Sequence, residues 1–300
     1  MKIFALIIPI LIIFNSPDCS PARNKKARPD ETINKNISKT PEKAATEQPI
    51  EQSSRDEVKI LAESQYSKVE TPFIFVARSA ETYAQLQNLA ENLPPASEID
   101  FTKSAIVAAF AGAKNTGGYS VSIKNAANKI SISIVNPPKD AMLAQVLTAP
   151  FAVALVSPGE NDSLDLNVAN EWKNAARNYK ITSASFTESG GFAGIQKNFD
   201  AEGAIGVWNF GDLATLAFDL AGKGAEKTRK LTTTASGTIK SGKIDLPSLD
   251  AGSFAQNPKP PLKVSGTLAG NKLSLVFEPL PTRVADGFQA SGKLEAERSN

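Results

Sequence analysis

The sequence predicts an α+β block followed by a mostly antiparallel, all-β block, with a disordered tether before both. Three observations lead to this prediction. Between residues 66 and 157, one helical pattern is followed by apolar runs that alternate with serine. After Lys180, strand-like runs are separated by glycine. From Asn15 to Gln65 there is no Phe, Tyr or Trp, so residues 23–65 have too few large apolar side chains to form a core.

The first residues indicate export. A charged start precedes the uncharged apolar run Ile3–Phe14, which is too short for a membrane-spanning helix and contains Pro9. We therefore expect an export signal over residues 1–22. The protein would then be located in the cell envelope, in the periplasm or outside the cell.

Cys19 follows this apolar run at the position where a bacterial lipoprotein carries its acylated cysteine. Acylation of Cys19 would make the membrane a partner through a lipid anchor. Ordinary signal cleavage after Ala22 would instead remove Cys19, because Ser20-Pro21-Ala22 has small residues at both required positions. Both alternatives stay open.

The first block spans residues 66–157. Ser79 can cap a helix that ends before Pro94-Pro95, and the apolar positions of that helix recur at helical spacing. The wholly apolar run Ala105–Phe110 is short enough to be a central strand. The other expected strands are Pro72–Val76, Tyr119–Ile123, Ile130–Val135 and Phe151–Val156.

Residues 158–179 are predicted to be a linker, with a hinge at 157–162 and a short helix within 167–179 that carries Trp172 and Ala176 on one face. Residues 180–300 are predicted to form a sandwich or barrel of roughly eight strands. Hairpins are expected at 237–244 and 269–272, and no internal repeat is evident. The expected strands are Ile181–Phe186, Ile195–Phe199, Ala204–Phe210, Leu213–Leu220, Lys230–Ile239, Leu262–Leu268, Leu273–Phe277 and Phe288–Leu294.

The composition excludes several classes of protein. The chain has no histidine and one cysteine, which excludes histidine-dependent nucleophiles, imidazole-bound metals, intramolecular disulfides and thiolate zinc clusters. Its 33 basic and 31 acidic residues give a net charge of +2, too balanced for a nucleic-acid binder. The segment 237–244 nearly matches a phosphate-binding loop, but Ile244 replaces the Ser or Thr that must reach magnesium.

A catalytic carboxylate pair needs no histidine and stays open, but nothing singles out two of the carboxylates. We therefore expect a protein that is not an enzyme and has no metal site and no cofactor.

Two loops place paired glycines before an aromatic residue. They are Thr116-Gly117-Gly118-Tyr119 and Ser189-Gly190-Gly191-Phe192. In one interpretation, the glycines supply positive φ angles for tight turns and the ring belongs to the core. Alternatively, the bare backbone lets a partner chain approach and the ring anchors it. These eight residues are the candidates for partner binding.

The first block resembles a known family. The runs Phe101-Thr102, Ala105–Val107, Thr116–Val121, Ala141-Met142 and Leu147–Phe151 are similar to the PrcB-type C-terminal domain. That family is named after a lipoprotein subunit of a cell-surface serine-protease complex. The resemblance covers about residues 66–157 and implies export, frequent lipid anchoring and a protease-associated role without catalytic residues.

The start of the second block also resembles a family. The segment Ser189–Ile195 is similar to the signature of the emfourin family, proteinaceous inhibitors of thermolysin-like metalloproteases. This resemblance implies an inhibitory role for the β-rich block.

These observations favour an exported, non-catalytic protein that stabilises or inhibits a secreted or surface protease, either a serine protease or a thermolysin-like metalloprotease. One alternative is a small-molecule or lipid carrier whose β-rich block closes as a barrel around an apolar ligand. The other is a structural envelope protein.

Overall fold

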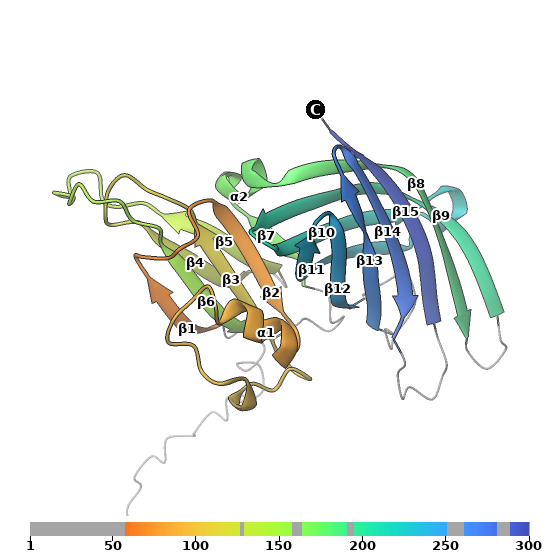
Figure 1. Ribbon diagram of the computed structural model, residues 1–300, viewed down its shortest axis with the longest axis horizontal. Helices are drawn as coiled ribbons and strands as arrows, with labels where there is room; N and C mark the ends of the chain where they lie inside the picture. The colour runs from red at the N-terminus through yellow and green to blue at the C-terminus, as the bar shows by residue number, and fades with distance from the viewer. Residues whose placement is uncertain are drawn as a thin grey trace, which may run out of the picture. The chain divides into compact units, whose positions relative to one another are not determined.

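The computed structural model describes residues 58–126, 129–157, 164–190, 195–250, 261–280 and 289–299. All of them belong to one compact unit within residues 49–300, which contains a β-rich first block and a barrel (Figure 1). The predicted export signal, Cys19 and tether residues 23–57 lie outside the described residues. Within the described stretches, no helix has the length and apolar character needed to cross a membrane.

The first block is built on a four-stranded antiparallel sheet with the strand order β1-β6-β3-β2. Every residue of β3 is buried, as expected for a central strand. Ser79 begins α1, since its side chain accepts a hydrogen bond from the Thr82 amide, which confirms the predicted cap. The bounds are β1 Lys59–Ser64, β2 Pro72–Ala77, α1 Ala80–Leu86, η1 Ala96–Glu98, β3 Ala105–Ala111 and β6 Phe151–Val156.

A second, three-stranded sheet has the order β4-β5-β7. It consists of β4 Ser120–Ala126, β5 Lys129–Val135 and β7 Leu166–Val168, and is followed by α2 Asn170–Ala175. The block is more strongly β than the α+β prediction implied, because α1 has seven residues and α2 six.

Two predicted boundaries need correction. β1 lies within the range 23–65 that was assigned to the tether, and it pairs with β6. The folded part of the chain therefore begins before residue 66. Within the predicted linker 158–179, β7 pairs with β5 and α2 buries Trp172 completely, so residues 164–176 belong to the first block.

The second block is a closed, antiparallel, eight-stranded barrel in which each strand pairs with the next along the chain and β15 pairs with β8. The prediction of a sandwich or barrel of about eight strands is thus resolved as a barrel. The strands are β8 Arg177–Gly190, β9 Ile195–Phe210, β10 Leu213–Gly222, β11 Lys230–Lys240, β12 Lys243–Asp250, β13 Pro261–Ala269, β14 Lys272–Pro279 and β15 Gln289–Arg298, with η2 Gly224–Glu226 after β10.

The list of expected strands needs two corrections. Ile195–Phe199 and Ala204–Phe210 are both strand, but they are parts of the single long strand β9, and β12 was not expected. Gly203 explains the apparent interruption of β9, since a Cβ there would lie 2.0 Å from the Asp219 carbonyl oxygen. Close approach of the two strands requires glycine at this point.

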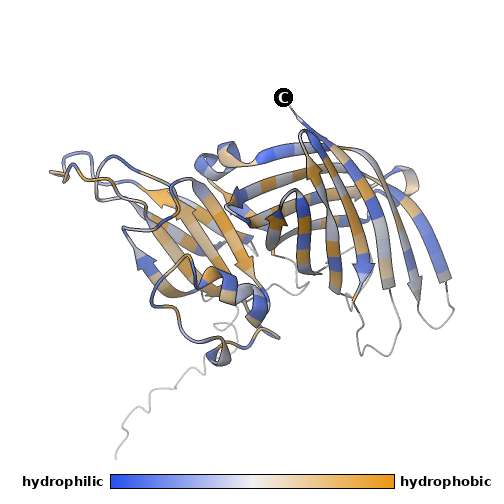
Figure 2. Ribbon diagram, viewed as in Figure 1, coloured by the Kyte–Doolittle hydropathy of each residue, from blue (hydrophilic) through white to orange (hydrophobic). Residues whose placement is uncertain are grey.

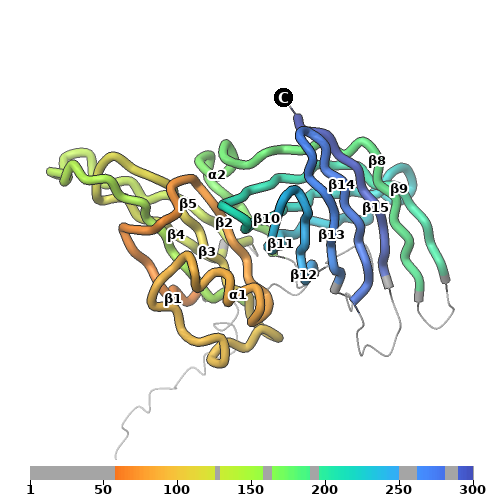
Figure 3. The backbone as a smooth tube through the Cα atoms, in the orientation of Figure 1, coloured from red at the N-terminus to blue at the C-terminus, as the bar shows by residue number. Residues whose placement is uncertain are grey.

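The barrel also contains a short repeat that the sequence analysis missed. Residues 236–239 (SGTI) and 265–268 (SGTL) each lead into a two-residue turn, visible as tight hairpins in Figure 3. A Cβ on Gly237 or Gly266 would lie 2.1 or 2.0 Å from a carbonyl oxygen of the neighbouring strand. The repeated unit is therefore a hairpin whose first strand carries a glycine where the neighbouring strand approaches closely. Both hairpins predicted from the sequence are confirmed.

The barrel interior is filled by apolar side chains. Phe277 lies 5.1 Å from Phe186 and 5.9 Å from Phe218 between ring centroids, and Phe186 lies 5.8 Å from Phe199. These rings belong to one buried cluster with leucines from most strands. The alternation of apolar and polar residues along the barrel strands is visible in Figure 2.

The outer wall of the barrel seals the free edge of β2. The Val76 amide donates to Ser236 Oγ at 2.8 Å, and Thr215 Oγ1 donates to the Ile74 carbonyl oxygen at 2.6 Å. Because the single Thr215 proton is used in this way, Ser236 is the donor in the 2.6 Å contact between the two hydroxyls. These buried hydrogen bonds give the Val76 amide and the Ile74 carbonyl oxygen partners at the edge of β2, where no further strand pairs.

Two tryptophans extend this contact. Trp172 Nε1 donates to the Phe110 and Phe73 carbonyl oxygens at 2.9 and 3.3 Å, and Trp208 Nε1 on the barrel donates to the Trp172 carbonyl oxygen at 2.8 Å. Phe210 packs on Phe73 with ring centroids 6.2 Å apart. The barrel wall thus contributes to the core of the first block.

Candidate functional site

The central strands β3 and β6 continue as a hydrogen-bonded pair beyond the sheet. Lys114 and Thr148 exchange backbone hydrogen bonds of 2.7 and 2.9 Å, and the Gly117 amide donates to the Ala144 carbonyl oxygen at 3.0 Å. Thr148, which is buried, also donates from Oγ1 to the Thr116 carbonyl oxygen at 2.9 Å. Two segments are therefore held side by side: the TGG turn, residues 116–118, and residues 137–149, which we call the docking arm.

The two glycines of the TGG turn have different roles. Gly118 has a φ of +86°, and a Cβ there would lie 2.9 Å from Pro137 Cβ and 3.0 Å from Leu143 Cδ2. At Gly117 the nearest atom to such a Cβ is 4.0 Å away. Only Gly118 therefore requires the absence of a side chain, because the docking arm packs on its bare backbone.

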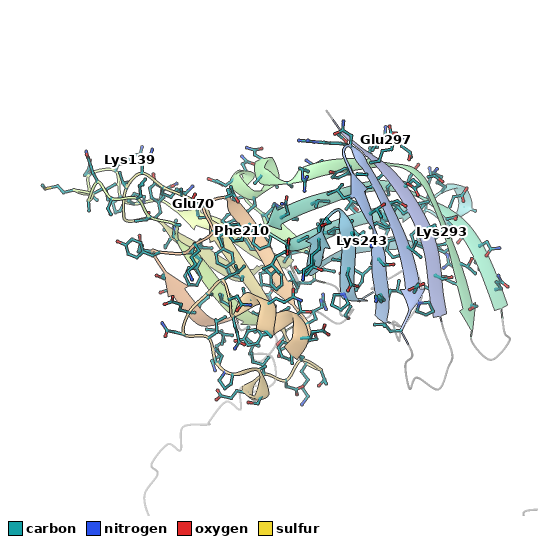
Figure 4. All side chains as sticks on the ribbon, viewed as in Figure 1. Glu70, Lys139, Phe210, Lys243, Lys293 and Glu297 are labelled. Atoms are coloured by element: carbon teal, nitrogen blue, oxygen red, sulfur yellow. The ribbon has the colours of Figure 1, made fainter. Side chains whose placement is uncertain are left out.

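The docking arm exposes apolar side chains. Met142 is fully exposed (102%), Leu147 is 71% exposed and Val146 41%. Figure 4 shows Lys139 on the same arm. Exposed apolar groups that are contiguous on a surface commonly mark a contact with another protein.

Gln65 links Tyr119 and the neighbouring Tyr66 to the base of the docking arm. Gln65 Nε2 donates to the Tyr119 carbonyl oxygen at 2.7 Å, and the Gln65 carbonyl oxygen accepts from the Ala149 amide at 2.9 Å. Tyr66, the next residue, is 62% exposed. The Tyr119 ring is half-buried, with Lys114 Nζ 5.7 Å from its centroid. Gln65 thus ties both tyrosines to the base of the docking arm.

The second predicted loop lies on the barrel. Ser189 and Gly190 end β8 and pair with Gln196 and Ile195 of β9, whereas Gly191 and Phe192 lie outside the described residues. Beside them, the buried Glu188 forms an ion pair with Arg229. Arg229 also contacts Glu226 at 2.6 Å. Arg229 thus joins two acidic side chains near the described end of β8. The described residues of the two candidate loops belong to different blocks, Thr116–Tyr119 to the first block and Ser189 and Gly190 to the barrel.

Two surface grooves accompany these elements. One, of about 580 Å³, lies between β1 and the turn after α1 and includes Tyr66. The other, of about 620 Å³, has two lysines and two aspartates in its lining, namely Lys129, Lys173, Asp165 and Asp219. Its Lys129 lies 2.5 Å from Asp165, which raises the pKa of Lys129. In the described part of the chain, no three acidic or thiol side chains converge as metal ligands would.

The sequence analysis named the TGG turn but missed the exposed residues of the docking arm. Met142, Val146 and Leu147 lie in the mostly apolar stretch 141–149, where Met142/Val146 and Leu143/Leu147 are four residues apart, the spacing of a buried helical face. The sequence alone therefore does not show that these side chains are exposed. The burial data show it.

One comparison with known proteins gave a match. Residues 105–157 match the family model described as PrcB C-terminal. No curated protein and no solved structure matches the chain. The segment that carries both the TGG turn and the docking arm is therefore similar to the PrcB C-terminal domain, as its TGGYS run indicated.

Proposed function

We propose that this protein is an exported, non-catalytic subunit of a protease complex and that it binds its protease through the docking arm and the TGG turn. One observation carries the proposal. The 53-residue segment that matches the PrcB C-terminal model, 105–157, is also the segment that exposes Met142, Val146 and Leu147.

The chemistry of the docking arm suits a protein contact. A methionine side chain adapts to an irregular apolar surface, and removal of exposed methionine and leucine side chains from water is favourable. The hydrogen bonds from Gly117, Lys114 and Thr148 hold the base of the arm in place before binding. The backbone at the base of the arm therefore needs little further ordering when a partner binds, which favours affinity.

The proposal must also state whether the protein stabilises or inhibits its protease. The resemblance of the TGGYS segment to a protease-complex subunit favours stabilisation of a serine protease. The resemblance of Ser189–Ile195 to emfourins favours inhibition of a thermolysin-like enzyme. We propose stabilisation through the docking arm as the main activity, because the apolar surface lies on the first block.

The carrier alternative is not favoured, because the phenylalanines and leucines of the barrel fill its interior. The envelope-protein alternative becomes the preferred one if no protease binds.

Capture from the native host tests the proposal. The tagged full chain and a Met142→Ser/Leu147→Ser variant are cross-linked in cells of the host, and bound proteins are identified by mass spectrometry. We expect a secreted protease with the wild type and its loss with the variant. Lys243→Ser, on the barrel exterior (Figure 4), is the matched control and keeps the partner. If no protease depends on the arm, the proposal is wrong.

Activity measurements then decide between stabilisation and inhibition. The captured protease is assayed for initial rate and for half-life with and without the full chain. A longer half-life at an unchanged rate supports stabilisation. Separately, stoichiometric inhibition of a thermolysin-like enzyme that is weakened by Phe192→Ala would support the emfourin-like role instead.

Lipid anchoring is tested at Cys19. Incorporation of labelled palmitate that Cys19→Ser abolishes supports the anchor. A mature chain that begins at Arg23 contradicts it.

A further inference from the structure

Met142 is presented to solvent by an anchored backbone. The residue that follows it, Leu143, packs at Gly118, and the next one, Ala144, accepts the hydrogen bond from the Gly117 amide. On the other side, the Ala141 amide donates to the Pro138 carbonyl oxygen at 3.1 Å. The backbone on both sides of Met142 is therefore fixed while its own side chain is fully exposed (102%).

The chain has two methionines, and the other is Met1. Removal of the export signal would leave Met142 as the only methionine of the mature chain. Cys19 is the one thiol, and cleavage after Ala22 would remove it as well. Sulfur oxidation would then be directed to one side chain on the surface that we propose to bind the protease.

We propose that Met142 is an oxidation site for hydrogen peroxide and that its sulfoxide weakens docking of the protease. The thioether sulfur attacks one peroxide oxygen, so that an S–O bond forms as the O–O bond breaks. The sulfur loses two electrons, and the peroxide is reduced to water. The product is methionine sulfoxide, a polar and hydrogen-bonding side chain in place of an apolar one.

The consequence for docking follows from burial. An apolar thioether enters a protein contact without losing a strong hydrogen bond to water. A sulfoxide must give up its hydration, and an apolar contact offers it no donor in return. We expect the dissociation constant for the protease to rise by about tenfold or more, since a penalty of this kind lies within the usual range for an unpaired polar group. This second step rests on the proposed function.

The first experiment needs no partner. The purified full chain is treated with hydrogen peroxide, and the peptide that contains Met142 is followed by mass spectrometry against a free N-acetylmethionine amide standard. Because the side chain is fully exposed, we expect one added oxygen at a rate close to that of the standard. An unchanged thermal midpoint is expected too, since Met142 lies outside both buried cores. If Met142 resists oxidation, the proposal is overturned.

The second experiment measures binding of the protease captured by the wild-type chain. Oxidised wild type should bind about tenfold more weakly, while Met142→Leu should bind normally and be unaffected by peroxide. Met142→Gln, which is polar and of similar length, should bind weakly without peroxide. If oxidised wild type binds as well as the reduced chain, or Met142→Leu loses binding equally on treatment, the docking effect is refuted. If the reduced wild type captures no protease, the proposed function fails, while the oxidation result is still judged on the peptide map.

Discussion

The first block and the barrel differ in how many large apolar side chains they expose to solvent. The large apolar residues that are exposed in the described part of the chain are all in the first block, namely Ile60, Tyr66, Val135, Met142, Val146 and Leu147. The described residues of the barrel expose none of comparable size. Its outer face carries charged groups such as Lys243, Lys293 and Glu297 (Figure 4).

This difference separates two roles. The barrel uses its apolar residues to fill its interior and, through Trp208 and Phe210, to pack against the first block. The first block has a buried core and, in addition, exposes apolar residues on its surface. We infer that the barrel supports the first block and that the first block meets the partner.

The largest expected effect tests whether the two blocks depend on each other. Trp172→Ala removes a fully buried ring together with its hydrogen bonds to two carbonyl oxygens. The free energy of unfolding should fall by about 3–5 kcal/mol. It is measured by urea unfolding, with near-ultraviolet signals to follow each block. Unfolding of the first block alone, with the barrel intact, would show that the barrel gives no support.

Phe277→Ala tests the filled interior of the barrel. The ring packs against Phe186 and Phe218, so the free energy of unfolding should fall by about 3 kcal/mol or more as a cavity is left. A loss below about 1 kcal/mol would instead indicate an open interior and favour a carrier. Binding of a fluorescent fatty acid by the wild type would point the same way.

Thr215→Val tests the seal between the barrel and β2. The substitution keeps the shape of the side chain but leaves the buried Ile74 carbonyl oxygen without its donor. We expect a loss of about 1–3 kcal/mol in the free energy of unfolding, measured in urea. Thr182→Val, at an exposed hydroxyl, is the matched control and should be close to neutral. Equal effects of the two variants would mean that the seal contributes nothing.

The smallest effect on stability is expected at the TGG turn. Gly118→Ala forces a Cβ against Pro137 and imposes a positive φ on alanine, which should cost about 1 kcal/mol and loosen the docking arm. Binding of the captured protease should weaken as well. Gly117→Ala has room for its Cβ and serves as the control. If both variants bind the protease like the wild type, the turn does not hold the arm for docking.

Local patterns predicted the elements of this fold better than their limits. Ser79 and the apolar run Ala105–Phe110 marked a helix start and a central strand, since capping and complete burial are visible in the residues themselves. β1 was missed because an edge strand with exposed Lys59 and Glu63 has the composition of a tether. The seal on β2 could not be predicted, because it joins residues far apart in sequence, Val76 and Ser236.

Only part of the candidate site was predicted, because local patterns do not show contacts between distant segments. Paired glycines identified the TGG turn, but they could not show which glycine requires a positive φ. The exposure of Met142 and Leu147 depends on the pairing of segments near Lys114 and Thr148, which no local period reveals.

Hydrogen–deuterium exchange on the purified complex with the captured protease tests most directly whether the first block meets the partner. The amides of residues 116–119 and 139–149 should exchange more slowly in the complex than in the free chain, while the described barrel strands should be unchanged. Slower exchange in the hairpin that joins β8 and β9, with the docking arm unaffected, would contradict the account and assign the contact to the barrel.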